Sequence, residues 1–296
     1  MTTMLISTAQ LAQHLTDPDW IIFDCRHDLM DAGKGERVYR EGHIPGAYLA
    51  NLDIDLSGEK TGINGRHPLP SPAAFTAFFA RHGVTNTSTI VAYDDVGGQF
   101  ASRLWWLARW IGLPSVLLLD GGIPKWIAEA RTLSREVPVP MHVHIPIHDG
   151  IPQSEPLQGH ADPLMVVSAD EVKSRLGDTT AMLLIDARAA ERYRGEVEPI
   201  DPVAGHIPGA YNRFYKENLN PDLTLRSVDD LHASFSQTLG ATPARRVVHQ
   251  CGSGVTACAN IFAMEYAGLK GSQLYAGSWS EWVSDPARPV ATGSER

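Results

Sequence analysis

The chain has 296 residues, of which 43% are hydrophobic, and a formal net charge of −9 at neutral pH. Its length favours two domains of ordinary size, each long enough to bury a core of its own. The acidic balance argues against a nucleic-acid or anionic-membrane partner, and no stretch approaches the roughly 18 apolar residues that a membrane span needs.

The N-terminal segment and the cysteines indicate the compartment. Residues 1–6 carry neither a basic region nor a long apolar run, so we expect no signal peptide. The cysteines are Cys25, Cys251 and Cys258. No pair has the CxxC spacing of a metal site, and three is an odd number for a disulfide framework. We therefore expect free thiols in a reducing, cytoplasmic environment.

An internal repeat organises the chain. The segment Gly-His-Ile-Pro-Gly-Ala-Tyr occurs at residues 42–48 and recurs letter for letter at 205–211. Further matching pairs keep the same order: apolar strands at 21–26 and 183–188, strands at 90–94 and 247–251, and glycine–tryptophan units at 120–126 and 276–282. The offset drifts from 163 (205 − 42) to 156 (282 − 126), which is far longer than the roughly 20–50 residues of a solenoid repeat. The chain is therefore two copies of one fold.

A proline-rich stretch separates the copies. It runs from Val137 to Pro163 and lacks a helical or strand pattern. We assign residues 1–136 to a first domain, 137–164 to a linker and 165–296 to a second domain.

Each copy alternates short apolar runs with helical patterns. In the second copy, strands are predicted at 182–185, from 247 onward and at 274–275. Ser168 followed by Glu171 predicts a helix that starts with a capping box. This alternation predicts an α/β fold in which each domain has a mainly parallel sheet flanked by helices. Ligands bind such sheets beyond the carboxyl ends of their strands.

Cys251 stands at such an end. It follows the strand at 247–250 and precedes Gly252, Ser253, Gly254, Val255 and Thr256, after which a helix is predicted. Free N–H groups of the loop and first helical turn converge there and, with the helix dipole, stabilise a thiolate nucleophile. Glycines let the loop curl so that its N–H groups point inward.

The other cysteines are interpreted as structural. The predicted helix has an apolar stripe: Val255, Cys258, Phe262, Tyr266 and Leu269. Cys258 lies on this stripe, which indicates packing, and Gly268 marks the helix end. Cys25 follows Asp24 in an apolar strand. A lone cysteine is most often a core residue, but the Cys-Gly-x-Gly turn argues for a reactive Cys251.

At these residues the chain resembles the 3-mercaptopyruvate sulfurtransferases, which are relatives of the rhodaneses. Residues 251–257 resemble their active-site loop, the two Gly-His-Ile-Pro-Gly-Ala segments their domain hallmark, and residues 277–282 their C-terminal signature. The resemblance covers residues 8–289. It implies two rhodanese-like domains, of which only the second is catalytic. Asp94 aligns with Cys251 and cannot carry a sulfane sulfur.

The resemblance also implies roles for individual residues. Arg192 matches the arginine that binds the anionic group of the donor. A second arginine expected shortly before residue 205 is missing, since residues 198–202 read Glu-Pro-Ile-Asp-Pro. His43 resembles a histidine near the family's active site, whereas its twin His206 is expected to be structural. Ser253 either binds a carbonyl or helps to relay a proton, or it is simply a small loop residue.

We therefore expect sulfur transfer by a ping-pong mechanism. Cys251 attacks the donor sulfur and carries it as a persulfide to a thiol, such as thioredoxin or a low-molecular-weight thiol, or to cyanide. The uncharged Gly252 and Ser253 favour 3-mercaptopyruvate over thiosulfate. No metal or organic cofactor is implied.

Three alternatives stay open. The first is a thiosulfate:cyanide sulfurtransferase. The second is a non-catalytic sulfur-carrier or regulatory module, although such modules usually lack the cysteine. The third is a cysteine phosphatase with the same fold, which would need arginine six residues after the cysteine, where this chain has Ala257.

Overall fold

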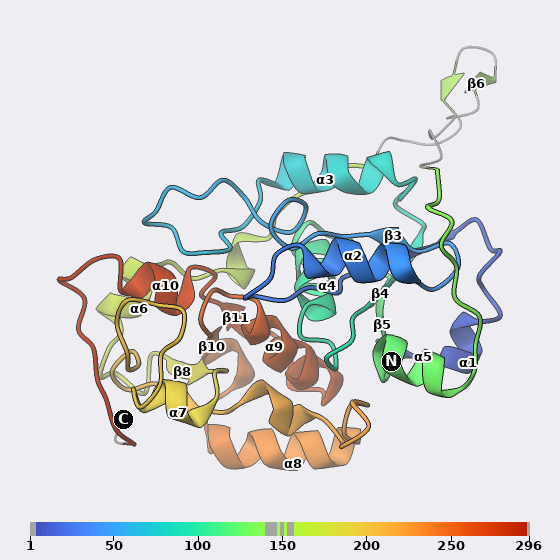
Figure 1. The fold of residues 1–296 in the computed structure, drawn as a ribbon. Helices are drawn as coiled ribbons and strands as arrows, with labels where there is room; N and C mark the ends of the chain where they lie inside the picture. The colour runs from blue at the N-terminus through green and yellow to red at the C-terminus, as the bar shows by residue number, and fades with distance from the viewer. Residues whose placement is uncertain (1–3, 140–146, 149–150, 153–156, 295–296) are drawn as a thin grey trace. The chain divides into compact units, whose positions relative to one another are not determined.

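The computed structural model describes residues 4–139, 147–148, 151–152 and 157–294, and Figure 1 shows its ribbon. The chain divides into two compact units. The first contains the residues up to Leu56 together with Pro70–Asp162, and the second contains Ser57–Leu69 together with the residues from Pro163 onward. The short segment Ser57–Leu69 thus packs with the second unit, although it precedes most of the first unit in sequence.

The first unit has a five-stranded, fully parallel sheet in the order β1-β5-β4-β2-β3. Its strands are β1 (Leu5–Ile6), β2 (Trp20–Asp24), β3 (Tyr48–Leu49), β4 (Thr89–Tyr93) and β5 (Val116–Leu119). Its helices are α1 (Thr8–Leu11), α2 (Lys34–Glu41), α3 (Pro72–Arg81), α4 (Ala101–Trp110) and α5 (Gly122–Ala128). The Asp94 turn lies between β4 and α4, where the parallel topology predicts a ligand-binding edge.

The second unit has a four-stranded parallel sheet in the order β11-β10-β8-β9. Its strands are β8 (Leu183–Asp186), β9 (Tyr211–Asn212), β10 (Val247–Gln250) and β11 (Gln273–Leu274). Its α-helices are α6 (Ala169–Ser174), α7 (Ala190–Tyr193), α8 (Val228–Leu239), α9 (Thr256–Tyr266) and α10 (Ser278–Trp282). Short 3₁₀ helices lie at η1 (Pro163–Met165), η2 (Tyr215–Asn218) and η3 (Ala244–Arg246).

Both faces of the second sheet are buried. Leu184 and Val248 point into a core with the tryptophans of α10. Leu183 and Val247, their neighbours in the strands, point into the opposite core with α8 and α9, which lie side by side in Figure 1. A parallel sheet covered on both faces explains why its strands read as continuous apolar runs.

The predicted α/β class and the parallel sheets are confirmed, as is the capping box. The Ser168 N–H donates to Glu171 Oε2 over 2.9 Å, and the Glu171 N–H donates to Ser168 Oγ over 3.3 Å. Nearly half of the proposed linker lies outside the described residues, at 140–146, 149–150 and 153–156. Two short antiparallel strands, β6 (Ile147–His148) and β7 (Ile151–Pro152), lie between those gaps.

The apolar stripe expected on the helix after Cys251 faces the core, and the burial extends beyond it. All residues from Ala257 to Met264 are buried, so α9 has no solvent-facing side there. The reason is its surroundings: α9 packs against β10, β11, η2 and α8. Val255 is the N-cap residue, and Gly268 follows the C-cap with φ of +83°, as the helix-end interpretation requires.

The repeated motifs form the same clamp in both units. Arg26 donates to the Asp24 carboxylate and to the Gly42 carbonyl, and Arg188 does the same with Asp186 and Gly205. Each arginine thus ties the end of a strand to the start of its Gly-His-Ile-Pro-Gly turn. Within the described residues, no helix has the length and apolar character that crossing a membrane requires.

His249 makes the stability of the second unit depend on pH. It lies fully buried in β10, with Nε2 3.1 Å from Met264 Sδ. Burial and the nearby Arg213 cation lower the pKa of His249 from 6.5 to about 3. The unfolded chain therefore binds a proton below pH 6.5 that the folded chain rejects, so stability falls as the pH drops from 6.5 towards 3.

We predict that His249→Leu reduces this acid sensitivity. Between pH 7 and pH 5 the wild type should lose about 2 kcal/mol more unfolding free energy than the variant. The reason is that only the wild type has a side chain at residue 249 that takes up a proton on unfolding. Urea denaturation at both pH values measures the difference, and the other titrating groups cancel because both proteins contain them. Equal losses in the two proteins would contradict the prediction.

Candidate functional site

Cys251 lies immediately after β10 and is 2% exposed. Its N–H donates to Ser278 Oγ over 3.0 Å, and its carbonyl accepts from the Trp279 N–H over 3.0 Å. The next carbonyl, of Gly252, accepts from the Ser280 N–H over 2.9 Å. The start of α10 therefore holds the backbone of Cys251 and Gly252 in place through three hydrogen bonds.

Several backbone N–H groups of the loop after Cys251 have no hydrogen-bond acceptor among the described residues. In the described part of the chain, the N–H groups of Gly252, Ser253, Val255 and Thr256 donate no hydrogen bond. Gly254 has φ of +77°, and a Cβ there would lie 2.3 Å from the Ala276 carbonyl oxygen, so only glycine allows this curl. Unpaired N–H groups at the start of an 11-residue helix form a site for an anion.

The matching turn of the first unit contains such an anion. The Asp94 carboxylate is buried and accepts four backbone N–H bonds of 2.7–3.0 Å, from Val96, Gly98, Phe100 and Ala101. Burial raises the pKa of Asp94, and these N–H groups oppose the rise because they favour the ionised form. The Asp94 side chain thus accepts the N–H groups of its own turn, whereas the N–H groups after Cys251 stay available to an anion.

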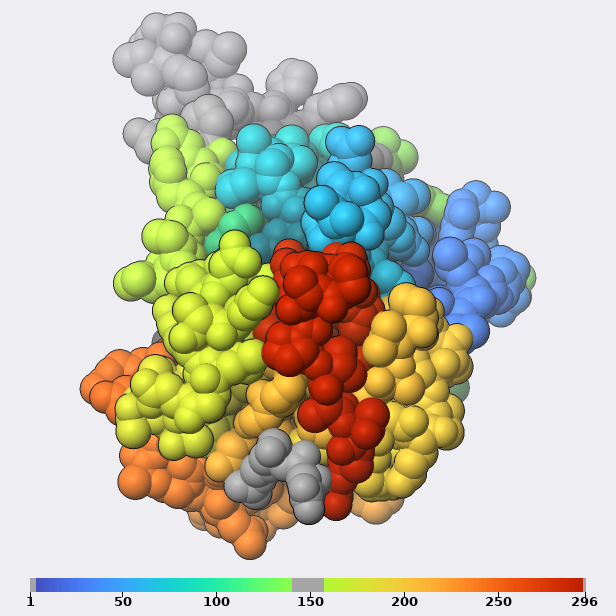
Figure 2. Space-filling model, turned by 90° about the vertical axis from the view of Figure 1, so that its left-hand side faces the viewer, coloured from blue at the N-terminus to red at the C-terminus, as the bar shows by residue number. Residues whose placement is uncertain are grey.

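The segment Ser57–Leu69 adds two residues that the sequence analysis missed. His67 Nδ1 lies 2.7 Å from Ser253 Oγ, and both side chains are buried. The Arg66 N–H donates to Ser280 Oγ over 3.0 Å. Figure 2 shows this segment in light blue against the red C-terminal elements. The sequence signal was weak, because the repeat directs attention to the second copy and these residues lie in the first.

Arg192 lies beside the loop, where the resemblance places it. Its Nη2 is 2.7 Å from Glu198 Oε1 and 3.3 Å from Asp201 Oδ2. A Cβ on Gly252 would lie 3.5 Å from Arg192 Nη1 and 2.9 Å from Arg66 Nη2, so both guanidinium groups border the loop.

The two carboxylates differ in pKa. Burial would raise the pKa of Glu198, but the Arg192 hydrogen bond and two backbone N–H groups lower it below its usual value. Burial prevails at Asp201 and raises its pKa, although Arg66 and Arg192 oppose the rise. Arg66, from a distant part of the sequence, thus brings a second guanidinium beside the loop.

The remaining candidates have structural contacts. His43 belongs to the first unit, is fully buried, and has its ring nitrogens 2.8 and 3.1 Å from the carbonyls of Tyr39 and Glu136. Its twin His206 contacts the Tyr193 carbonyl in the same way. Cys258 is fully buried and its thiol donates to the Gly254 carbonyl over 3.3 Å. All three cysteines are free.

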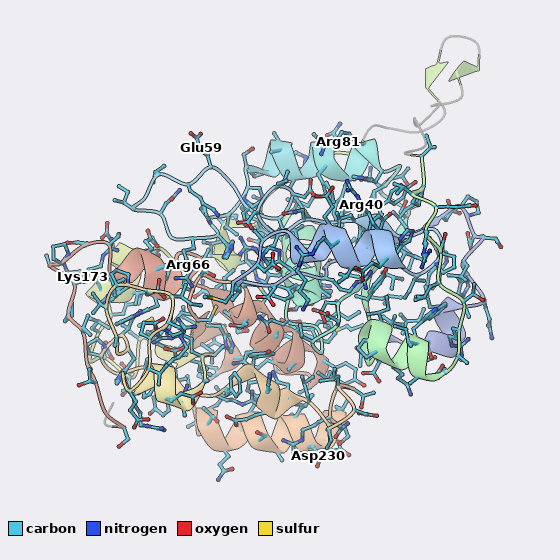
Figure 3. The ribbon with its side chains drawn as sticks, viewed as in Figure 1. Arg40, Glu59, Arg66, Arg81, Lys173 and Asp230 are labelled. Carbon is cyan, nitrogen blue, oxygen red and sulfur yellow. The ribbon has the colours of Figure 1, made fainter. Side chains whose placement is uncertain are left out.

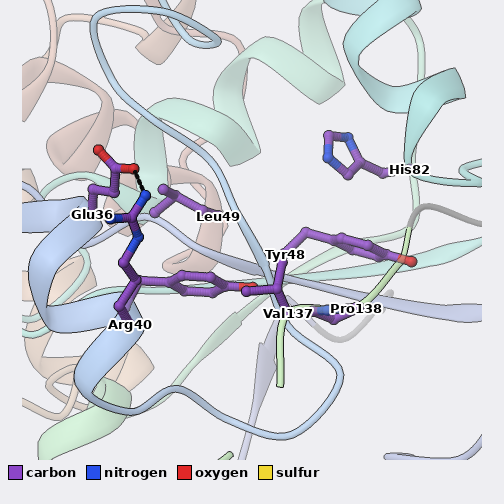
Figure 4. Close-up of a pocket in the computed structure, with 8 residues that line it drawn as sticks. Glu36, Arg40, Tyr48, Leu49, His82, Val137 and Pro138 are labelled. Atoms are coloured by element: carbon purple, nitrogen blue, oxygen red, sulfur yellow. Dashed lines mark hydrogen bonds and ion pairs between the residues drawn. The ribbon is translucent and has the colours of Figure 1, made fainter. Parts of the chain in front are cut away.

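A pocket of about 270 Å³ lies elsewhere, in the first unit (Figure 4). It is lined by Glu36, Tyr39, Arg40, Tyr48, Leu49, His82, Val137 and Pro138. Its rim carries the Glu36–Arg40 ion pair, and burial lowers the pKa of His82. No cysteine or other activated nucleophile lines it, so the chemistry is assigned to the Cys251 loop.

Known proteins match the chain along nearly all of its length. Residues 7–129 and 168–285 each match the family model described as a rhodanese-like domain. A probable 3-mercaptopyruvate sulfurtransferase of Pseudomonas aeruginosa is 45% identical, over 98% of each chain. A putative thiosulfate sulfurtransferase of Mycobacterium tuberculosis is 36% identical, also over 98% of each chain.

A solved structure agrees. The crystal structure of SseA from Escherichia coli, described with the rhodanese fold of 3-mercaptopyruvate sulfotransferases, matches with a TM-score of 0.74 at 29% identity. The match covers 94% of this chain and 99% of that one. The expected fold and family are therefore confirmed, and the chain belongs to the rhodanese family as a sulfurtransferase with two rhodanese-like domains.

Proposed function

We propose that the chain transfers sulfur from 3-mercaptopyruvate to a thiol or cyanide through a persulfide on Cys251. The observation that carries this proposal is the pair of matching turns. In one, four backbone N–H groups donate to a carboxylate. In the other, a buried cysteine is followed by N–H groups that donate no hydrogen bond among the described residues. A turn of this kind stabilises both a thiolate and a persulfide anion.

The proposed first step forms a sulfur–sulfur bond. The Cys251 thiolate attacks the thiol sulfur of the donor, and the carbon–sulfur bond breaks. The electron pair of the carbon–sulfur bond leaves with the enolate of pyruvate. The enolate takes up a proton to give pyruvate, and the donor's thiol group loses a proton. In the second step an acceptor thiolate or cyanide attacks the outer sulfur, and the sulfur–sulfur bond breaks to restore the Cys251 thiolate.

His67 and Ser253 are suited to the proton transfer. The 2.7 Å contact joins the imidazole ring of His67 to the hydroxyl of Ser253, which lies two residues after Cys251. We assign Ser253 the relay of the donor thiol proton to the leaving enolate, with His67 holding the hydroxyl in place. This assignment replaces the alternative in which Ser253 is only a small loop residue.

Thiosulfate is the second candidate donor. It is favoured by the relative in M. tuberculosis named for that substrate and by the two guanidinium groups beside Gly252. However, Glu198 and Asp201 balance the two positive charges of Arg66 and Arg192. A dianion therefore gains less from this site than a single carboxylate does, which supports 3-mercaptopyruvate.

The proposal also includes the sulfur acceptor and the boundaries of the domains. We assign the acceptor to thioredoxin, a low-molecular-weight thiol or cyanide, in a reducing compartment. We keep residues 1–136 as the non-catalytic domain, 137–164 as the linker and 165–296 as the catalytic domain, with Ser57–Leu69 contributing to the catalytic unit.

Treatment with 3-mercaptopyruvate should add one sulfur atom to Cys251. Intact-protein mass spectrometry with peptide mapping measures the addition. Cys251→Ser should abolish it, whereas Cys258→Ser should retain it because the Cys258 thiol is packed against the Gly254 carbonyl. A sulfur that maps to Cys258 would rule out the mechanism.

Saturation kinetics should rank the donors. We expect a higher kcat/KM for 3-mercaptopyruvate than for thiosulfate, because the four charges beside Gly252 sum to zero. Initial rates with cyanide as a common acceptor provide the comparison. If thiosulfate gives the higher value, the donor assignment fails and the persulfide mechanism stands.

Asp94→Ala should weaken the fold and leave the chemistry intact. Four N–H groups would lose a buried acceptor, at a cost of roughly 1–3 kcal/mol or more in unfolding free energy. Denaturation curves measure the loss, and rates at temperatures well below the midpoint measure sulfur transfer. A loss of turnover as severe as that of Cys251→Ser in the folded variant would assign the first turn a part in the reaction.

A further inference from the structure

A buried arginine lies in the core of the second unit. Arg213 directly follows β9 and is 2% exposed. Its guanidinium carbon lies 3.5 Å from the ring centroid of Phe235. Three uncharged side chains accept hydrogen bonds from its guanidinium group: Asn218 Oδ1 over 2.6 Å, Asn260 Oδ1 over 3.1 Å and Ser234 Oγ over 3.3 Å. These partners hold the guanidinium group in place without balancing its charge.

The acidic side chains around Arg213 do not pair with it. Among the described residues, no carboxylate forms an ion pair with this arginine. Glu265 of α9 instead accepts from the Gly271 N–H over 2.8 Å. Figure 3 labels Asp230 at the exposed start of α8. The acidic residues of η2 and α8 are all exposed: Glu217, Asp229 and Asp230.

Arg213 is charged at neutral pH. Burial lowers its pKa to about 10, while the charge of Glu217 opposes this change and that of Arg226 adds to it. His249 of β10 also lies near Arg213, but it is neutral at this pH because its pKa is about 3. A buried cation is screened less than a surface cation, and it costs stability unless an anion balances it. The second unit therefore contains a positive charge that calls for an anion.

Helix α9 connects Arg213 to the Cys251 loop. Asn260 binds the arginine twice, since its Oδ1 accepts from Nη1 and its Nδ2 donates to the Arg213 carbonyl over 2.9 Å. Asn260 is four residues after Thr256, the first residue of α9, which is about 6 Å along the helix axis. The cation thus lies about one helical turn behind the N–H groups that donate no hydrogen bond in the loop.

The other buried charges near the loop are paired. Arg66 and Arg192 lie against Glu198 and Asp201, and Arg188 lies against Asp186. The first copy has no arginine at the matching position, since 213 − 163 gives Ala50, which is buried after β3 as Arg213 is after β9. The unbalanced cation therefore occurs in the copy whose turn carries a thiol.

We propose that Arg213 is the buried counterion of the sulfur anion on Cys251, and that its field favours the thiolate before the reaction and the persulfide anion after the first step. The inference rests on the proposed function, since it assumes that Cys251 carries a negative charge. Arg213 acts at a distance through the core and along α9, without touching the donor. The uncharged Asn218, Asn260 and Ser234 are positioning residues, because a carboxylate in their place would cancel the field.

The sharpest test cancels the charge and keeps the arginine. Ser234→Asp places a carboxylate beside Arg213 Nη2. Alkylation of Cys251 by iodoacetamide at pH 7 should become roughly tenfold slower, because unit charges about 10 Å apart interact at that level inside a protein. The curve of rate against pH should also move to higher pH. The matched control is Ser234→Asn, which has nearly the same shape without the charge and should react like the wild type.

Removing the charge gives a second measurement. Arg213→Met should slow the same alkylation, and Arg213→Lys should recover part of the rate because it restores a cation. Phe235→Leu controls for loosened packing, since it changes the contact beneath the guanidinium group and leaves the charge unchanged. Peptide mapping assigns the alkylated cysteine, and thermal denaturation records that each variant is folded.

The outcomes separate the two proposals. If the wild type forms no persulfide from 3-mercaptopyruvate, the proposed function fails, whereas the alkylation rates still measure the effect of Arg213 on Cys251. Equal rates in Ser234→Asp and Ser234→Asn overturn the role of Arg213. A rate in Phe235→Leu as slow as that in Arg213→Met also overturns it, because packing would then explain the loss.

Discussion

The structure depends on one local constraint, the turn between a central parallel strand and the following helix. The N–H groups of such a turn converge, and they require an anion or another acceptor. In the first unit Asp94 provides the anion permanently, with four backbone bonds to its carboxylate. In the second unit Cys251 stands in its place, and the N–H groups of its loop stay available for the negative charge of the proposed thiolate and persulfide.

The surrounding architecture keeps this turn in place. The Asp186–Arg188 pair ties the end of β8 to the Gly205 carbonyl, and Arg188 lies 4.8 Å from the ring centroid of Trp279 in α10. That helix in turn bonds the Cys251 carbonyl through the Trp279 N–H. The repeated motifs are therefore structural supports. They recur in the first unit, which is proposed to be non-catalytic and where Arg26 and Asp24 make the same clamp to Gly42.

The charged and polar groups beside the Cys251 loop come from both copies of the repeat. Arg192 and Glu198 belong to the second copy, but Arg66 and His67 come from a segment of the first copy that packs with the second unit. The carboxylates of Glu198 and Asp201 balance the charges of Arg66 and Arg192, so the loop has guanidinium groups beside it without a large local positive charge. A site of this kind discriminates by the number and direction of its hydrogen bonds more than by charge.

The sequence by itself determined the duplication, the α/β class, the capping box at Ser168 and the Cys251 turn, because each depends on residues that are close in the chain or repeat along it. It also identified Asp94 as the counterpart of Cys251. Only the tertiary structure decided that α9 is buried on all sides and that His67 contacts Ser253, 186 residues away. It alone placed Arg66 beside Arg192 at Gly252. Contacts between residues so far apart depend on how loops pack against finished elements, and no local pattern of residues encodes that.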